Sequence, residues 1–337
     1  MVFAPIRGLP APVARIVLGT ASFGALLPGE RRSAARTRTF DLLTSVLESG
    51  GNAFDTARVY RLGGSERLLG EWMREARCRD RVILVSKGGH PSLLTFRGRV
   101  RAPAVRQDLE ESLRALRTEH IDLYLLHRDD PAVPVERIVE MLHALLSSGK
   151  VRACGVSNWT HERVDEANRF ARSQGLAELA VSSPQFSLAD WRRPPFPGCV
   201  SISGDQGRGA RSWYRASGVS VLAWSSLAGG FFAPPAASCR GLRTGPYRTE
   251  ANDSRLARAR QMAGDKGMTT AQIALAYVTS QPFAAFPVVS TRSLGRFREN
   301  AEAAALCLTP AEMAWLESGA APGEDHGEPD ESSARAR

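Results

Sequence analysis

The stretch that decides the fold spans residues 82–127 and holds two short apolar runs, VILVSK (Val82–Lys87) and IDLYLLH (Ile121–His127). Both runs are rich in aliphatic and β-branched residues and are bounded by turn residues, which is typical of buried strands. Between them, Ala104–Arg117 has the apolar spacing of an amphipathic helix. A strand, a helix and a second strand in this order predict two parallel strands joined by a helical crossover.

The same alternation continues on both sides of this unit. Further buried strands are expected at Arg15–Gly19, Asn52–Asp55, Val151–Asn158, Leu179–Ser183, Val219–Trp224 and Ala285–Val289. Further helices are expected at Ser33–Ser49, Ser65–Ala76, Val135–Ser148, His161–Ser173, Ala210–Ala216, Ser254–Gly264, Thr270–Ser280 and Leu294–Ala305. Eight such units in roughly 250–300 residues predict a (β/α)₈ TIM barrel, whose active site lies at the carboxyl ends of its strands.

A doubly wound open sheet is the alternative architecture. It would place Gly-x-Gly-x-x-Gly after the first strand, and Leu18–Gly24 (LGTASFG) lacks that spacing. The prediction is therefore one barrel domain over residues 1–318. The irregular segments Pro194–Gly209 and Gly229–Thr249 are long enough to cover an active site, and the polar tail over residues 319–337 is expected to be disordered.

Polar residues close four consecutive strands: Asp55, Lys87, His127 and Asn158. In a barrel these strand ends converge on one mouth, where a buried Asp, Lys and His must satisfy one another. Taken singly, Asp55 could be a loop cap, Lys87 a solvated strand end and His127 a core histidine. Their occurrence at successive strand ends favours a functional site.

Several motifs then resemble one family. FDTARVY (Phe54–Tyr60) and GGSERLLG (Gly63–Gly70) are similar to the FDTA-x-x-Y-G-x-G-x-S-E-x-x-L-G signature of the aldo-keto reductases. Further blocks of the family are resembled, in order, by Ser86-Lys87, DLYLLH (Asp122–His127), GVSN (Gly155–Asn158), STR (Ser290–Arg292) and RFREN (Arg296–Asn300). The resemblance extends from about Arg15 to Leu308.

The resemblance implies a (β/α)₈ barrel that reduces carbonyl groups with NADPH, and a catalytic tetrad of Asp55, Tyr60, Lys87 and His127. A tyrosine, with a pKa near 10, would donate a proton to the oxygen on which charge develops. Lys87 would lower the pKa of that tyrosine, and Asp55 would hold the ammonium in place. His127 would orient the carbonyl oxygen.

The resemblance also implies cofactor contacts. Ser157 and Asn158 would bind the nicotinamide carboxamide, and Trp224 would lie against the nicotinamide face. Other cofactor contacts are expected from Gly19, Thr20 and Ser183, and pyrophosphate contacts from Ser225, Leu227 and Gly229. The 2′-phosphate would be bound by Ser290, Thr291, Arg292 and Arg296, and the adenine by Glu299 and Asn300.

Three positions depart from the family pattern. Ser183 stands where the family usually has Gln, and Gln185 follows two residues later. Ser290 stands where many members have a Lys beside the 2′-phosphate, so that recognition would depend on Arg292 and Arg296. Trp224 replaces the usual Tyr, and its larger face can still stack.

The amino-acid composition excludes several classes of protein function. Apolar residues make up 43% and charged residues 23% of 337 residues, as in soluble globular proteins. The net charge of +9 comes from scattered arginines, which argues against nucleic-acid binding. The sequence offers no signal segment, membrane span, zinc spacing or disulfide framework, so a cytoplasmic protein with reduced cysteines and no metal is expected.

The predicted function is reduction of a small-molecule aldehyde or ketone. Arginines in the mouth loops suggest an anionic or sugar-like substrate, although solvated loop charge explains them equally well. These loops are Arg58–Gly63, Gly88–Ala102, Arg128–Pro134, Asp190–Trp213 and Phe231–Thr249. Two rival interpretations stay open, an NADPH-binding regulatory subunit and a barrel of unrelated chemistry such as a lyase, and the sequence assigns no oligomeric state.

Overall fold

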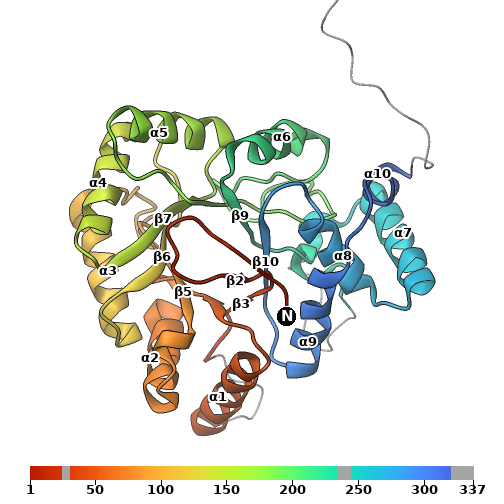
Figure 1. The fold of residues 1–337 in the computed structure, drawn as a ribbon, viewed down its shortest axis with the longest axis horizontal. Coiled ribbons are helices and arrows are strands. Elements are labelled where there is room, and N and C mark those ends of the chain that lie inside the picture. Colours follow the sequence, from red (N-terminus) through yellow and green to blue (C-terminus); the bar gives the residue numbers. More distant parts are fainter. Residues whose placement is uncertain (25–30, 234–243, 320–337) are drawn as a thin grey trace, which may run out of the picture.

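The computed structural model describes residues 1–24, 31–233 and 244–319. Eight parallel strands close into a barrel in the order β10-β3-β4-β5-β6-β7-β8-β9, with helices packed around it (Figure 1). The barrel strands are β3 (Val17–Gly19), β4 (Ala53–Asp55), β5 (Ile83–Gly88), β6 (Ile121–Leu126), β7 (Val151–Ser157), β8 (Val181–Ser183), β9 (Ser220–Ala223) and β10 (Ala285–Val289). The predicted TIM barrel is confirmed, and each expected strand takes part in it.

The helices are α1 (Arg32–Glu48), α2 (Gly64–Ala76), α3 (Ala102–Leu116), α4 (Val135–Ser147), α5 (His161–Ser173), α6 (Arg208–Ser217), α7 (Glu250–Lys266), α8 (Thr270–Thr279), α9 (Leu294–Glu302) and α10 (Pro310–Ser318). Helix α7 begins before the expected Ser254, because the Thr249 hydroxyl caps it by accepting the Asn252 N–H. None of the helices in the described ranges is long and apolar enough to cross a membrane. Cys239, residues 234–243 of the second irregular segment and residues 320–337 of the expected disordered tail lie outside the described residues.

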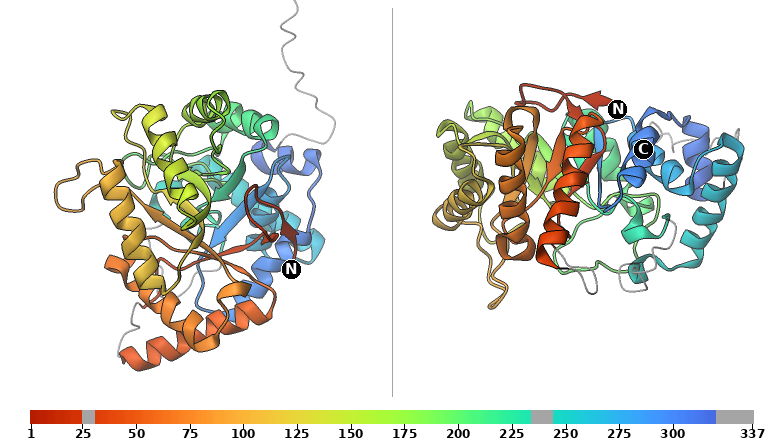
Figure 2. Two further views of the ribbon diagram at one scale, coloured as in Figure 1. Left: turned by 60° about the vertical axis from the view of Figure 1, so that its left-hand side comes forward. Right: turned by 90° about the horizontal axis from the view of Figure 1, so that it is seen from below.

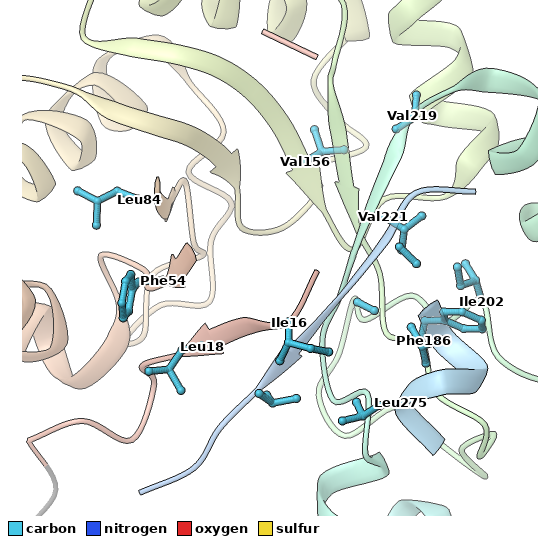
Figure 3. Packing of buried hydrophobic residues seen from close by; sticks show 14 of the residues in the cluster. Ile16, Leu18, Phe54, Leu84, Val156, Phe186, Ile202, Val219, Val221 and Leu275 are labelled. Carbon is cyan, nitrogen blue, oxygen red and sulfur yellow. The ribbon is translucent and has the colours of Figure 1, made fainter. Parts of the chain in front are cut away.

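The apolar side chains form two layers, because successive residues of a strand point to opposite faces. Val85 and Leu125 belong to an inner cluster inside the barrel. Leu18, Phe54 and Leu84 belong to an outer cluster between the strands and the helices (Figure 3). Burying a side chain of this size contributes about 1.5–3 kcal/mol, so both layers stabilise the barrel.

A hairpin of β1 (Phe3–Ala4) and β2 (Val13–Ala14), which the sequence did not predict, crosses the amino end of the barrel (Figures 1 and 2). Ile6 belongs to the inner cluster. The Asn52 side chain fastens the hairpin by donating to the Pro12 carbonyl and accepting from the Ala14 N–H, both at 2.9 Å. The hairpin therefore covers one end of the barrel, and the loops that follow the strands surround the other.

Candidate active site

Three neighbouring strands change from apolar to polar at their carboxyl ends. Asp55, Lys87 and His127 lie on or just after β4, β5 and β6, and each is less than 8% exposed. Each follows an inner-cluster residue of its strand by two positions: Ala53, Val85 and Leu125. Because side chains alternate along a strand, the polar residues point into the barrel above this apolar layer. The predicted convergence of the three side chains follows from this register.

Lys87 and Asp55 form a buried ion pair. The Lys87 ammonium donates to Oδ1 of Asp55 and, at 3.0 Å, to the Thr56 carbonyl. Burial alone would lower the pKa of Lys87, but Asp55 and Tyr60 raise it above the ordinary lysine value. Burial raises the pKa of Asp55, and Lys87 opposes that shift. The pair therefore keeps a positive charge fixed beneath the mouth.

Tyr60 lies above this pair, at the start of a 3₁₀ turn, Tyr60–Gly63. The Lys87 ammonium is 5.2 Å from the centroid of the Tyr60 ring. Burial raises the pKa of the Tyr60 hydroxyl, and the charge of Lys87 acts in the opposite direction without cancelling it. The sequence analysis anticipated only the lowering by Lys87, because burial of the hydroxyl is a property of the folded site. At neutral pH, Tyr60 is a protonated acid beside a fixed cation.

His127 completes the group. Its ring lies edge-on to Tyr60, with centroids 5.7 Å apart. Burial, together with Lys87, Arg128 and His90, keeps the pKa of His127 well below the ordinary histidine value, so the ring is neutral. Its Nδ1 is enclosed without a hydrogen-bond partner among the described residues. A buried N–H without an acceptor is costly, which favours the tautomer with the proton on Nε2.

His90 lies at the same mouth, and the sequence analysis did not assign it a role in the site. Its ring is 5.0 Å from the His127 ring, and its Nδ1 bonds the Pro91 carbonyl at 2.8 Å. A carbonyl can only accept, so Nδ1 carries the proton and Nε2 is left as an acceptor. Burial lowers the pKa of His90, which keeps that acceptor available. The sequence feature that pointed to His90 was its position three residues after Lys87, a predicted site residue.

Four predicted cofactor residues form one hydrogen-bonded group on β7, β8 and the end of β9. The Trp224 indole N–H donates to Oδ1 of Asn158 at 3.2 Å, and Asn158 Nδ2 donates to Ser157 Oγ at 2.9 Å. Ser157 Oγ donates in turn to the Ser183 carbonyl at 2.9 Å. The Ser183 hydroxyl donates to Leu222 O at 2.7 Å. This network fixes the Asn158 amide and the edge of the Trp224 ring at the mouth.

Gln185 does not replace the glutamine that the family has at position 183. Its amide is buried among serines, donating to Ser187 and accepting from Ser201 and Ser203. Strand β8 ends at Ser183, and Gln185 lies beyond it, where it forms isolated bridges to Ser201 and Trp224. Its amide is therefore committed to supporting the Pro184–Ser203 segment.

The residues expected to face the pyrophosphate lie on the loop after β9, and Gly19 and Thr20, expected as other cofactor contacts, lie at the end of β3. Ser225 and Gly229 have positive φ angles of 52° and 66°, and Leu227 precedes the 3₁₀ turn Ala228–Gly230. The Thr20 hydroxyl is already bonded to Asp55 O at 2.9 Å and Ser65 Oγ at 2.8 Å. A Cβ at Gly19 would come within 3.1 Å of Ser290 Oγ, so this strand end and the start of the β10 loop are in close contact.

Of the residues expected at the 2′-phosphate, Ser290, Thr291 and Arg292 lie between β10 and α9, and Arg296 lies in the first turn of α9. The Ser293 hydroxyl caps α9 by accepting the Arg296 N–H. Arg292 and Arg296 are exposed, and within the described ranges neither forms an ion pair. Ser290 and Thr291 lie beside them. Further along α9, Glu299 is exposed and Asn300 is buried.

Comparisons with known proteins find relatives along most of the chain. The chain is 32% identical over 313 residues to norsolorinic acid reductase A of Aspergillus parasiticus, covering 89% of this chain and 76% of the relative. It is 27% identical over 319 residues to an aryl-alcohol dehydrogenase of Pestalotiopsis microspora, covering 91% and 79%.

Solved structures are also similar. An aldo/keto reductase from Klebsiella pneumoniae in complex with NADP and acetate superposes with a TM-score of 0.67 at 27% identity, covering 91% of each chain. A thermostable aldo-keto reductase shares the fold with a TM-score of 0.72, covering 94% of this chain and 99% of that one. The model of the aldo/keto reductase family matches residues 15–320. The chain therefore belongs to the aldo/keto reductase family.

Proposed function

We propose that this protein is an NADPH-dependent reductase that converts an aromatic aldehyde or ketone to an alcohol, with Tyr60 as the proton donor. One observation carries the proposal: at the open end of the barrel, a buried Lys87–Asp55 pair lies beneath Tyr60, and neutral His127 lies beside it. The names of the relatives, a norsolorinic acid reductase and an aryl-alcohol dehydrogenase, support an aromatic substrate.

The residues present suit a nicotinamide cofactor. Arg292, just before α9, and Arg296, in its first turn, form no ion pair with another described residue, and they are a donor set that fits the dianionic 2′-phosphate of NADPH. Asn158, Ser157, Ser183 and Trp224 would hold the nicotinamide end, and Glu299 and Asn300 the adenine. The loops with Ser225, Leu227 and Gly229, and the β3 end with Gly19 and Thr20, would flank the pyrophosphate. When bound, this cofactor supplies the hydride.

The four tetrad side chains would orient the substrate and supply the proton. The Nε2–H of His127 would bind the carbonyl oxygen and orient it towards the Tyr60 hydroxyl. As negative charge develops on that oxygen, Tyr60 would donate its proton. The Lys87 ammonium would stabilise the phenolate that is left behind, and Asp55 would keep the ammonium in position.

The walls of the mouth favour a flat substrate. The Trp191 ring is 5.8 Å from Trp224, and His90 and Tyr60 present further rings around His127. Aromatic pairs gain about 0.5–1.5 kcal/mol beyond their buried area. An aryl carbonyl therefore fits this surface better than the sugar-like substrate that the loop arginines suggested.

Absorbance loss of NADPH with a panel of aryl and sugar aldehydes tests the proposal. We expect turnover on aryl aldehydes, and Tyr60→Phe should reduce kcat by about 10²–10⁴-fold without weakening NADPH binding, since only the hydroxyl is removed. Tyr277→Phe is the matched control, because its hydroxyl bonds Glu317 on the outer helices. Near-normal kcat in Tyr60→Phe, or NADPH binding without turnover on any carbonyl, would contradict the proposal.

A further inference from the structure

An open pocket with a volume of about 430 Å³ lies outside the barrel, between α2 and α3. It is lined by four arginines, Arg58, Arg67, Arg114 and Arg117, and by two acidic residues, Glu71 and Glu111. In Figure 1, α1 lies between α2 and α9, so the pocket is separate from the proposed phosphate site at α9. The volume is in the range of small-molecule sites.

The two carboxylates of the pocket are already occupied. Glu111 accepts from Gln107 on Oε1, at 2.9 Å, and from Arg58 on Oε2, at 2.6 Å. Hydrogen bonds from Gln107 and Arg58 lower the pKa of Glu111, so it is ionised. Glu71 meets Arg36 at 3.4 Å and Arg117 at 3.9 Å. Glu111 pairs with Arg58, and Glu71 pairs with Arg36 and Arg117. The charge of Arg114 also lowers the pKa of Glu111, without an ion pair between them within the described ranges.

Arg67 and Arg114 lack a carboxylate partner within the described ranges. Among the described residues, Arg67 hydrogen-bonds the Leu62 carbonyl at 3.5 Å, and Arg114 hydrogen-bonds the Glu110 carbonyl at 3.3 Å. Each guanidinium has five N–H donors in a planar fork that matches phosphate oxygens. The pocket therefore has many more hydrogen-bond donors than acceptors. Its four arginines and two glutamates give it a formal net charge of +2.

The backbone beside the pocket is also unusual. Arg61, Leu62 and Gly63 have consecutive φ angles of 51°, 54° and 80°, a region that non-glycine residues rarely adopt. This turn lets the backbone at Gly63 approach the pocket. A Cβ at Gly63 would come within 2.8 Å of Arg58 Nη1 and 3.3 Å of Arg67 Nη1. Glycine at position 63 therefore avoids a clash with the Arg58 guanidinium and leaves bare backbone beside the two arginines.

We propose that this pocket binds a phosphorylated small molecule, with Arg67 and Arg114 as its principal ligands and Arg58 as a fixed third donor. The site is independent of the proposed reductase activity. The pocket adjoins the turn that begins at Tyr60, but the proposal concerns ligand binding and no effect on catalysis.

Calorimetric titration with pyrophosphate tests the claim. The protein is first given about one equivalent of NADP to fill the cofactor site, and ionic strength is held constant with chloride. We expect one pyrophosphate per chain, and a loss of about ten- to a hundredfold in affinity in each of Arg67→Gln and Arg114→Gln, as for charged hydrogen bonds. Both side chains are exposed, so the variants should fold, and unchanged melting temperatures without pyrophosphate would verify this.

Arg137→Gln is the matched control, because Arg137 is an exposed arginine on α4, away from the pocket, that pairs with Glu140. It should bind pyrophosphate as the parent protein does. Citrate, a carboxylate of similar charge, should bind more weakly. The proposal is overturned if no binding heat appears, if all three variants bind equally, or if citrate matches pyrophosphate.

Discussion

At the scale of single residues, Lys87 and Asp55 act as one unit. Asp55→Asn would leave a buried ammonium unpaired, and Lys87→Met would remove the cation that opposes the rise in the pKa of Tyr60. Each change should lower kcat by roughly 10²-fold, and the double variant should lose much less than the product of the two. Steady-state kinetics of the parent protein, the two single variants and the double variant measure the coupling. If the two losses in kcat multiply in the double variant, the residues act independently.

The protonation states of Tyr60 and His127 predict a wide pH range for reduction. Reduction needs a protonated Tyr60 and a neutral His127. The pKa of Tyr60 lies above the ordinary tyrosine value, and the pKa of His127 lies well below the ordinary histidine value. Tyr60 therefore stays protonated and His127 stays neutral at every pH between these two pKa values. The pH profile of kcat/KM for aldehyde reduction should therefore show no loss caused by His127 near pH 6.5 or by Tyr60 below about pH 10. Loss of rate near pH 6.5 that is absent in His127→Gln would contradict the assigned state of His127.

At the scale of elements, the strands were predictable because they are short, largely apolar runs between turn residues, and several of them are rich in β-branched residues. The convergence of Asp55, Lys87 and His127 could be predicted for the same reason, since these residues lie at or just after strand ends. Tyr60 lies five residues after β4, and its place in the tetrad came from the family resemblance. Strands β1 and β2 have two residues each, too few for a period to emerge. Helix α10 was not predicted either, although its sequence has a helix-start signal, a capping box of Thr309 and Glu312. His90 could not be placed, because its contact with His127 depends on how the loop after β5 folds back.

The start of α9 should decide which nicotinamide cofactor is preferred. Arg296→Ala should weaken NADPH by about ten- to a hundredfold, the loss expected for charged hydrogen bonds, and leave NADH unchanged because NADH lacks the 2′-phosphate. The preference should shrink as salt rises, since the site is exposed. Tryptophan fluorescence can follow both titrations, with Trp224 as a reporter.

Arg298→Ala is the control for this helix. Arg298 is exposed on α9 as well, but its guanidinium reaches Ser49 Oγ at 3.4 Å, towards α1. It should therefore change neither affinity. Equal affinity of the parent protein for NADH and NADPH would refute the arginine assignment and favour a dual-specificity member with Ser290 in place of the lysine.

At the scale of the whole molecule, the barrel separates a stabilising end from a reactive end. The hairpin covers the amino end and inserts Ile6, which is 4% exposed, into the inner cluster, while the tetrad lies at the carboxyl end. Ile6→Ala should lower the free energy of unfolding by about 2–5 kcal/mol and leave kcat unchanged under conditions where the protein stays folded. Phe3→Ala, in the same hairpin but 45% exposed, should cost less than about 0.5 kcal/mol. Urea unfolding followed by circular dichroism, alongside kcat, measures both effects. A fall in kcat in folded Ile6→Ala would mean that packing at the amino end also positions the tetrad, and equal stability of the two variants would mean that the hairpin does not seal the barrel.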